Sequence, residues 1–432
     1  MEWQKLYKER TMSAEDAIKL IHSGDRVVIG HAVGVPLAIT DVLAAHKDDY
    51  ENVEIVQMVS MGNAKFAEPE MQGHFRVNSL FVGAFTKLAV KEGRADFTPC
   101  SFSEVPGLFQ EELPVDVAVI QVSPPDKQGY VSLGVSVDYT LPAAQMAKKV
   151  IAQVNTEMPR TLGDTALHVS QIDCFVEISH PILELALPKI GETERAIGEN
   201  CAKLIKDGDT LQLGIGAIPD AVLLFLKNKK DLGIHSEMIS DGVVELIESG
   251  VVTNARKNFH TGKAVVTFLM GTKRLYDYAD DNQAIAMYPV NYVNDPYVAG
   301  KNDNLVSINS CVQVDLMGQV ASESVGLTQI SAVGGQMDFV RAAKISKGGR
   351  SIIAIGSTAG KGTISKIVPF LDKGAAVTTS RTDVDYVVTE YGIAKLRGRT
   401  LKDRARALIE IAHPDFRNDL IKEFESRFHC MY

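Results

Sequence analysis

Residues 207–242 read DGDTLQLGIGAIPDAVLLFLKNKKDLGIHSEMISDG, and the rest of the chain can be understood from this stretch. An apolar run at 210–213 predicts a β-strand, and the glycines at 214 and 216 predict a tight turn after it. An amphipathic pattern at 218–226, with Pro219 in its first turn, predicts a helix. Residues 234–239 then predict a second short strand. This order is typical of an α/β sheet.

Glu237 is the strongest candidate for a catalytic residue in this stretch. It lies in an apolar β run, where a carboxylate is costly unless it has a partner or a function. Glycines after a strand let the backbone approach a bulky ligand, and the next helix N-terminus offers unpaired N–H groups to an anion. Strand ends beside a glycine turn are where α/β sheets place their chemistry. We therefore expect Glu237 and the turn at 214–216 to belong to one site.

A weaker copy of the same pattern occurs near the N-terminus. Residues 19–30 match residues 203–214 at a constant offset, and Pro36 and Ala38 match Pro219 and Ala221 after one residue of slippage. Further on, residues 57–62 lie over residues 237–242. Gln57 therefore stands where the second copy has Glu237, so one copy carries an ionisable carboxylate and the other its neutral amide. We interpret the chain as two related α/β halves with one active carboxylate near the seam between them.

The two halves define the expected domains. Residues 180–191 contain Pro181 and Pro188 and have the composition of a connection, so we place the boundary near Gly191. Residues 1–191 then form an N-terminal α/β domain, and residues 192–432 form a C-terminal α/β domain that carries the candidate glutamate. Continuous apolar runs such as 115–122 and 148–154 predict strands buried on both faces of a parallel sheet. The expected fold class is α/β, with two related domains and mostly parallel sheets.

Composition narrows the functional classes. The chain has 432 residues, 45% hydrophobic and 23% charged, which is typical of a globular protein with substantial cores. A net charge of -9 argues against a nucleic-acid partner. Its five cysteines are widely spaced without a CxxC pair, so we expect neither disulfides nor a thiolate zinc site. No stretch is long and apolar enough for a bilayer, and we expect a cytoplasmic protein with no membrane partner.

Two glycine motifs suggest nucleotide binding, but neither fits well. The turn at 214–216 resembles part of a dinucleotide fingerprint, yet Pro219 stands where the third glycine is needed. The run at 356–363 resembles a P-loop, but it has three residues between the glycines where four are needed. The first pattern keeps an NAD-dependent dehydrogenase as an alternative, whereas the second leaves only a basic loop that could lie near a ligand phosphate.

Histidines, serines and aspartates give weaker signals. The ten histidines show no metal-ligand spacing, so we expect no metal site; His31 and His235 flank the two glycine turns, where each is either structural or a polar contact. No GxSxG motif surrounds a serine, which disfavours a serine hydrolase. Three aspartates are most simply turn or cap residues: Asp126, Asp241 and Asp338.

Long motifs in both halves resemble one family, the acetyl-CoA hydrolase/transferase family. In the second half the runs are GIGAIPDAV (214–222), GIHSEMISDGVVEL (233–246), FLMGTKRLYD (268–277), VSINSCVQVDLMGQVASES (306–324), SAVGGQMDFVRAA (331–343) and TEYGIAKLRGRTLKDRARALIEIAHPDF (389–416). In the first half they are SPPDKQGYVSLGVSVDYT (123–140) and GDTALHVSQID (163–173). The resemblance is strongest to members that transfer CoA to 4-hydroxybutyrate, or between butyryl-CoA and acetate.

This resemblance implies a function and a set of site residues. It implies CoA transfer between a short-chain acyl-CoA and a free carboxylate, with Glu237 as the nucleophile that forms a glutamyl-CoA thioester. It places Gly214, Ile215, Gly216, Ala217, Ile218, Val312 and Gly335 at the thioester end of CoA. The N–H groups of Ile215 and Gly335 are the expected oxyanion donors, the latter before a helix predicted to begin near Met337. Choice of acyl group is expected to depend on the loops near His31, Gln57 and 102–107.

The same resemblance implies CoA as a substrate, no permanently bound cofactor, and a homodimer or higher homo-oligomer. An acyl-CoA hydrolase would use the same glutamate and differ only in admitting water, and the residues do not separate the two. A non-catalytic CoA-binding protein would tolerate loss of Glu237, and a dehydrogenase would bind nicotinamide. These alternatives stay open at the level of sequence.

Overall fold

The computed structural model describes residues 2–62 and 65–432, which fold into two compact units. The first unit holds the described residues up to Ala186 together with Val265–Val293. The second holds Leu187–Ala264 and Asn294–Tyr432. Within the described ranges, no helix has both the length and the apolar character that crossing a bilayer requires.

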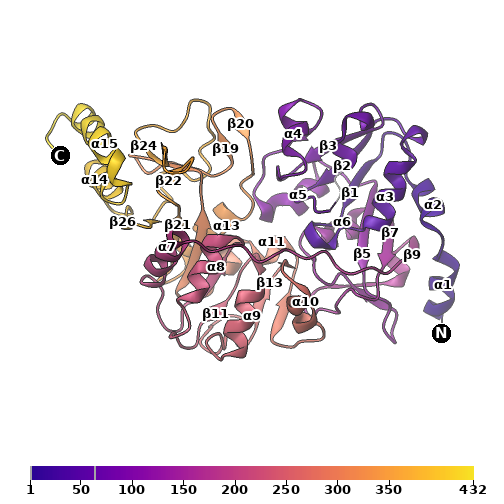
Figure 1. The fold of residues 1–432 in the computed structure, drawn as a ribbon. Coiled ribbons are helices and arrows are strands. Elements are labelled where there is room, and N and C mark those ends of the chain that lie inside the picture. The colour runs from indigo at the N-terminus through magenta and orange to yellow at the C-terminus, as the bar shows by residue number, and fades with distance from the viewer. Residues whose placement is uncertain (1, 63–64) are drawn as a thin grey trace. The chain divides into compact units, whose positions relative to one another are not determined.

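The first unit is built on a parallel sheet (Figure 1). Seven of its described strands lie in the order β4-β3-β2-β1-β5-β7-β9. Every side chain of β5 is buried, as expected for a strand inside a parallel sheet that is covered on both faces. The apolar runs at 115–122 and 148–154 are thereby confirmed as strands. The strands are β1 (Arg26–Ile29), β2 (Val53–Gln57), β3 (Phe75–Ser79), β4 (Asp96–Phe97), β5 (Val117–Val122), β7 (Lys149–Val154) and β9 (Cys174–Glu177).

Short helices and strands complete the first unit around an apolar core. Apolar residues of α3, including Ile39 and Leu43, pack there with Val27 and Val119 of the sheet. The helices are α1 (Glu2–Arg10), α2 (Ala14–Ala17), α3 (Leu37–Ala45), α4 (Lys87–Lys91), α5 (Val105–Gln110), α6 (Thr140–Met146), α10 (Lys273–Ala279) and α11 (Val290–Val293). The remaining strands are β6 (Tyr130–Ser132), β8 (Ala166–His168), β14 (Phe268–Leu269), β15 (Ile285–Met287) and β13 (Ala264–Val266), whose first residue belongs to the second unit.

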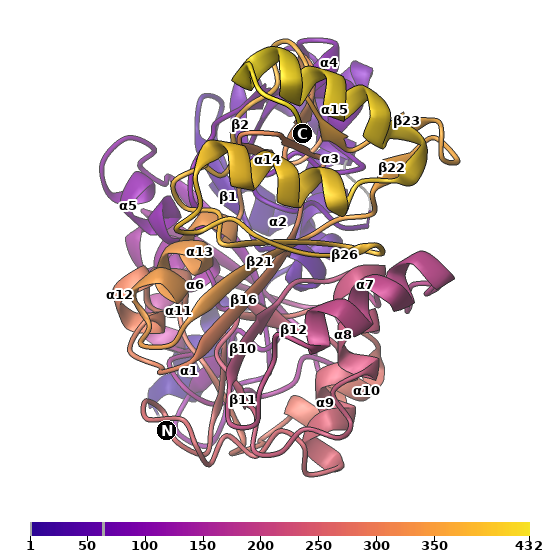
Figure 2. The ribbon, with the colours of Figure 1, turned by 90° about the vertical axis from the view of Figure 1, so that its left-hand side faces the viewer.

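The second unit has its own sheet, in which six described strands lie in the order β11-β10-β16-β21-β25-β26. Its neighbours pair in parallel except for β25 and β26, which form an antiparallel edge. Figure 2 shows α7 and α8 on one face of this sheet and α13 on the other. The strands are β10 (Thr210–Leu213), β11 (Gly233–Ile234), β16 (Leu305–Ser310), β21 (Arg350–Ala354), β25 (Tyr386–Thr389) and β26 (Gly392–Lys395). The expected α/β class with mostly parallel sheets is confirmed.

Smaller elements of the second unit surround that sheet. Its helices are α7 (Glu192–Ala202), α8 (Ala217–Leu224), α9 (Asp241–Glu248), α12 (Pro296–Ala299), α13 (Gln336–Ile345), α14 (Leu401–Glu410) and α15 (Pro414–Phe428). Its further strands are β12 (Met238–Ile239), β17 (Gln313–Asp315), β18 (Val320–Ala321), β19 (Ser324–Val325), β20 (Thr328–Gln329), β22 (Thr358–Ala359), β23 (Ile364–Ser365) and β24 (Ile367–Val368). Leu408 and Phe424 of the last two helices pack with Ile353 and Val387 of the sheet in a second apolar core.

The two sheets share a common order, as the internal duplication predicts. In the first unit β1 lies between β2 and β5, within the order β2-β1-β5-β7. In the second unit β10 lies between β11 and β16, within the order β11-β10-β16-β21. In each, a helix connects the central strand to its parallel neighbour, α3 in one unit and α8 in the other. Gln57 ends β2, and Glu237 follows β11 closely. The strand registers, however, do not match the amide to the carboxylate. Glu54 pairs with Arg26 in one sheet and Gly233 pairs with Thr210 in the other, so Gln57 takes the place of Ser236, one residue before Glu237.

One segment departs from the expected division at Gly191. Residues 265–293 belong to the first unit although they follow a large part of the second along the chain. The physical reason is backbone pairing: Phe268 forms a β-bridge with Ser136, and Met287 forms one with Gly163. A Cβ at residue 163 would overlap the Met287 backbone, so glycine is required at this crossing. Such pairing joins distant parts of the chain and leaves no local composition signal.

Candidate active site

Glu237 lies between two short strands rather than inside one. The sequence predicts a continuous strand at 234–239, and this prediction is wrong, because the strand divides into β11 and β12. Ser236 causes the break: its hydroxyl, not its backbone, bonds to both the N–H and the carbonyl of Leu213, at 3.2 and 3.1 Å. This pair joins the end of β10, directly before the glycine turn, to the residue directly before Glu237. The half-buried Glu237 therefore lies outside the β-ladder, next to the glycine turn.

An asparagine holds the Glu237 carboxylate. Nδ2 of Asn294 donates to Oε2 of Glu237 at 2.8 Å, and Asn294 itself is completely buried. Asn294 directly precedes Asp295, whose side chain caps α12 by accepting from the N–H groups of Tyr297 and Val298. The cap fixes the backbone beside Asn294 and so fixes the origin of its side chain. Sequence reasoning missed Asn294, since the run Asn-Asp-Pro reads only as a turn before a helix.

Gly335 forms the wall behind the same carboxylate. It is the N-cap residue of α13, which begins at Gln336, one residue before the predicted start. Its φ of -92° is open to any residue, so backbone conformation does not require glycine here. Space does: a Cβ would overlap Oε2 of Glu237 and Nδ2 of Asn294 and would lie 3.0 Å from Cδ of Glu237. Glycine at 335 is therefore needed for the carboxylate to occupy its position.

Asn294 also reaches a second carboxylate. Its Nδ2 lies 3.4 Å from Oδ2 of Asp338, a residue in the first turn of α13 that is 2% exposed. Its Oδ1 has no hydrogen-bond partner among the described residues. An unpaired buried acceptor costs about 1–3 kcal/mol, so the amide keeps this orientation because both carboxylates attract its N–H groups. Sequence analysis assigned Asp338 to turns and caps and so missed its nearness to Glu237.

The glycine turn at 214–218 leaves open space. A Cβ on Gly214 or Gly216 would meet no atom within 4 Å, and Ile215 is 41% exposed. Gly216 has a φ of 114° and caps α8, which begins at Ala217 with no side-chain cap. The first N–H groups of α8 thus receive no side-chain acceptor from the capping residue. Room at the glycines and uncapped N–H groups are both compatible with the expected CoA contact of residues 214–218.

The expected oxyanion donors differ from Val312 in one respect. The N–H groups of Ile215 and Gly335 have no acceptor among the residues that the structure describes. The N–H of Val312, by contrast, donates to the carbonyl of Ala321 at 2.8 Å. Val312 is half-buried between β16 and β17. The roles of these three residues toward CoA stay predictions.

Both histidines beside the glycine turns are buried within their own units. Nδ1 of His235 lies 3.1 Å from Nδ2 of Asn302. Nδ1 of His31 lies 3.0 Å from Oδ2 of Asp138, and aromatic rings surround the imidazole. Nε2 of His31 has no partner among the described residues. Gln57 is buried too, with Nε2 at 3.4 Å from the carbonyl of Gly30. Their effect on acyl choice stays a prediction.

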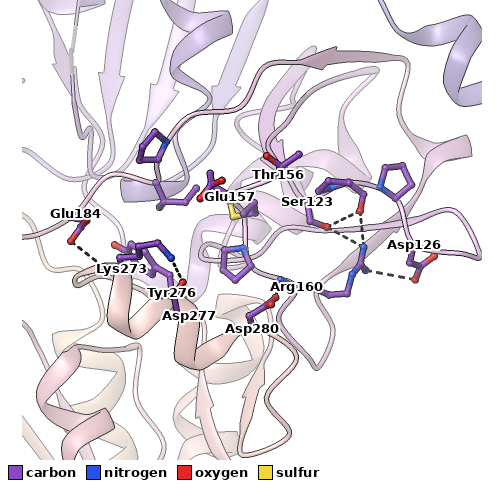
Figure 3. Close-up of a pocket in the computed structure, with 16 residues that line it drawn as sticks. Ser123, Asp126, Thr156, Glu157, Arg160, Glu184, Lys273, Tyr276, Asp277 and Asp280 are labelled. Carbon is purple, nitrogen blue, oxygen red and sulfur yellow. Dashed lines mark hydrogen bonds and ion pairs between the residues drawn. The ribbon is translucent and has the colours of Figure 1, made fainter.

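A cavity of about 540 Å³ in the first unit contains none of the predicted site residues. Figure 3 shows Arg160 directed at Ser123 and Asp126 on one side, and Lys273 beside Asp277 on the other. Asp126 accepts backbone N–H bonds from Gln128 and Tyr130 and is a turn residue, as expected. The SPPD run (123–126) therefore forms part of the wall of this cavity. The side chains of Ser123 and Asp126 make hydrogen bonds within that wall.

The P-loop resemblance at 356–363 has no structural support. These residues lead through β22 and β23, an antiparallel hairpin, and no helix follows the glycines. A P-loop needs a helix whose N-terminal N–H groups face the phosphates. Lys361 lies at the tip with a φ of 57°. A nucleotide hydrolase is therefore excluded as an interpretation of this motif.

Comparison with known proteins gives full-length matches. The acetyl-CoA hydrolase/transferase N-terminal domain matches residues 1–184, and the C-terminal domain of the same name matches residues 271–424. The 4-hydroxybutyrate coenzyme A transferase of Clostridium kluyveri is 65% identical over 99% of this chain and 100% of its own length. The butyryl-CoA:acetate CoA-transferase of Anaerostipes caccae is 38% identical over 98% of each chain. An acetyl-CoA hydrolase of Yarrowia lipolytica is 26% identical, over 99% of this chain and 92% of its own length.

A solved structure agrees with these matches. The crystal structure of 4-hydroxybutyrate CoA-transferase from Porphyromonas gingivalis is 46% identical and superposes with a TM-score of 0.86. It covers 99% of this chain and 100% of its own. Similarity at this level, over both halves, extends to the fold as well as to the sequence motifs.

Proposed function

The chain belongs to the acetyl-CoA hydrolase/transferase family, and from that premise we propose that Glu237 is the nucleophile of its CoA transfer. The chain is a CoA-transferase that acts on short-chain acyl-CoA and free carboxylates, as its full-length relatives are. The observation that carries the role of Glu237 is its carboxylate, held by Nδ2 of Asn294 at 2.8 Å against the bare Cα of Gly335. A glutamate held in one direction, with no Cβ on the residue behind its carboxylate, is suited to attack a thioester.

The proposed cycle makes and breaks only bonds to acyl carbons. One carboxylate oxygen of Glu237 attacks the acyl-CoA carbonyl and expels CoA thiolate, which gives a mixed anhydride. The thiolate then attacks the carbonyl carbon of Glu237 and expels the free acid, which leaves a glutamyl-CoA thioester. A second carboxylate attacks that thioester and reverses both steps to leave as the new acyl-CoA. CoA enters as substrate, so we propose that this chemistry needs no permanently bound cofactor.

Asn294 is placed to assist the attack on Glu237 itself. When the other carboxylate oxygen forms the anhydride bond, Oε2 becomes the carbonyl oxygen of the glutamyl group. Negative charge develops on that oxygen during thiolate attack, and Nδ2 of Asn294 already donates to it. For the substrate carbonyl we propose the N–H groups of Ile215 and Gly335 as donors. The remaining CoA contacts are proposed at Gly214, Gly216, Ala217, Ile218 and Val312.

We propose that the enzyme exchanges CoA between 4-hydroxybutyrate or butyrate on one side and acetate, as acetyl-CoA, on the other. The relatives named for these acids support the choice, whereas the acetyl-CoA hydrolase of Yarrowia lipolytica is only 26% identical. A hydrolase would let water attack the same anhydride or thioester, and exclusion of water is what separates the two outcomes. We also propose a cytoplasmic homodimer or higher oligomer, an expectation that follows from the family alone.

A panel of acceptors tests this function. Purified protein is incubated with acetyl-CoA and, in separate reactions, with 4-hydroxybutyrate, butyrate, propionate or no acid. We expect new acyl-CoA to form at rates far above CoA release without acid, with 4-hydroxybutyrate or butyrate preferred. CoA release that is equally fast without acid would identify a hydrolase. Binding of NADH by the same preparation, without transfer, would instead support the dehydrogenase alternative.

A further inference from the structure

We infer that Asp338 is a positioning residue for this reaction, because it holds the amide of Asn294 in the orientation that serves Glu237. The inference rests on the proposed function and assigns a further residue to the same site. Nothing in the sequence pattern separates Asp338 from an ordinary residue of a first helical turn. Its contact with Asn294 does, since Asn294 touches the nucleophile directly.

The geometry is that of one amide shared by two carboxylates. Nδ2 of Asn294 lies 2.8 Å from Oε2 of Glu237 and 3.4 Å from Oδ2 of Asp338. An amide NH₂ has two hydrogens, one for each acceptor. Asn294 is completely buried and Asp338 is 2% exposed, so water does not replace either contact readily. If one carboxylate is removed, the other therefore becomes the main acceptor that sets the orientation of the Asn294 amide.

Asp338 matters most when Glu237 has reacted. A carboxylate attracts an N–H group more strongly than a neutral carbonyl does, and Glu237 becomes a neutral carbonyl in the anhydride and in the thioester. At that stage Glu237 no longer holds the amide firmly, although the next step requires an N–H group at its carbonyl oxygen. Asp338 is not acylated and remains an acceptor in every state. It thus keeps the donor directed at the reacting carbonyl between steps.

The unpartnered oxygen of Asn294 supports the inference that Asp338 orients this amide. Oδ1 is buried without a hydrogen-bond partner among the described residues, so nothing on that side of the side chain favours the observed orientation. The orientation is fixed from the NH₂ side alone. Gly335 and Asp338 lie one turn apart at the start of α13, on the same face of the helix. One helical turn therefore provides both the wall beside Glu237 and the anchor of its hydrogen-bond donor.

A double-mutant cycle tests the inference. The rate of glutamyl-CoA thioester formation is measured in a single turnover for wild type, Asp338→Leu, Asn294→Ala and the double variant. We expect Asp338→Leu to slow the reaction by up to about 100-fold, as misplacement of a catalytic group does, with a smaller change in KM. In the Asn294→Ala background the same change should have little further effect. Asp338→Asn, which keeps a neutral acceptor oxygen, should lose less of the rate than Asp338→Leu.

Stability controls separate positioning from folding. Asp385→Asn alters another buried aspartate, in a cavity wall with Ala343 and Lys344 near the far end of α13, and should not slow thioester formation, whatever its effect on the melting temperature. If Asp338→Leu does not fold, Asp338→Ala replaces it in the cycle because it removes the acceptor without adding volume. Additive effects, or a full rate in the Asp338 variant, would overturn the inference alone. A wild-type protein that forms no thioester would overturn the proposed function with it.

Discussion

At the scale of single residues, the candidate site depends on Gly335 and Asn294, which fix the position of the Glu237 carboxylate. Glu237 could be selected as the candidate nucleophile from the sequence because a carboxylate in an apolar run is conspicuous, although its match to Gln57 in the repeat is one residue out of register. Asn294 could not, because its importance arises from a contact across 57 residues of chain. Gly335 was expected beside CoA, and the structure adds the reason for glycine: the Glu237 carboxylate occupies the space of a Cβ.

Gly335→Ala tests this packing at the same scale. The added Cβ overlaps Oε2 of Glu237 and Nδ2 of Asn294, so the carboxylate must move out of line. We expect kcat to fall by about 100-fold while the melting temperature changes little, since φ at this position suits alanine. Gly83→Ala is the matched control, because a Cβ there meets nothing within 4 Å. A Gly335→Ala enzyme with normal turnover would refute the packing argument.

At the scale of elements, the strands and the helix around the site were only partly predictable. The strand at 210–213, the turn after it and the following helix were expected and are present as β10 and α8. The strand at 234–239 was not continuous, because the Ser236 side chain replaces a backbone partner at Leu213. Local propensity cannot reveal such a replacement. Alternating apolar residues remain compatible with a strand until the competing side-chain bond is known.

A buried lysine supports the end of β11 and makes a pH-dependent prediction. Nζ of Lys257 donates to the carbonyls of Ile234 and Lys263, each at 2.7 Å, and burial lowers the pKa of its ammonium from 10.5 to about 7. Between these pH values the unfolded chain binds the proton and the folded chain does not. The free energy of unfolding contributed by Lys257 therefore rises with pH from about 7 to 10.5, by at most about 1.4 kcal/mol per unit.

Urea unfolding at pH 7, 8 and 9 compares wild type with Lys257→Met. We expect the difference in unfolding free energy to move in favour of wild type as pH rises, because methionine carries no proton. Lys301→Met, a change at an exposed lysine, should show no such trend. A constant difference between wild type and Lys257→Met across this range would mean that Lys257 is protonated in the folded chain throughout.

At the scale of the whole molecule, the duplication and the α/β class were predictable, and the full division into units was not. The repeat is visible because both copies keep the same glycines and apolar runs in the same order. The return of residues 265–293 to the first unit is invisible, because bridges such as Phe268 to Ser136 depend on distant partners. The remaining contacts of CoA, and the acyl selectivity expected near His31 and Gln57, stay predictions.

The cycle as a whole predicts ping-pong kinetics. The first acid must leave before the second enters, since both use the thioester on Glu237 in turn. Initial rates measured over a grid of acyl-CoA and acceptor concentrations should therefore give parallel lines in double-reciprocal plots. Exchange of labelled acid into its own acyl-CoA should occur without a second acid. Intersecting lines, with no such exchange, would require both substrates to bind together.

The most direct measurement traps the thioester itself. Protein is incubated with acyl-CoA and no acceptor, reduced with borohydride, digested and mapped by mass spectrometry, with Glu237→Gln treated in the same way. We expect a reduced glutamate within residues 233–242 of wild type and none in a freshly prepared Glu237→Gln protein, which should fold normally and lose transfer by several orders of magnitude. A label on another residue, or wild-type turnover by Glu237→Gln with deamidation excluded by mass, would contradict it.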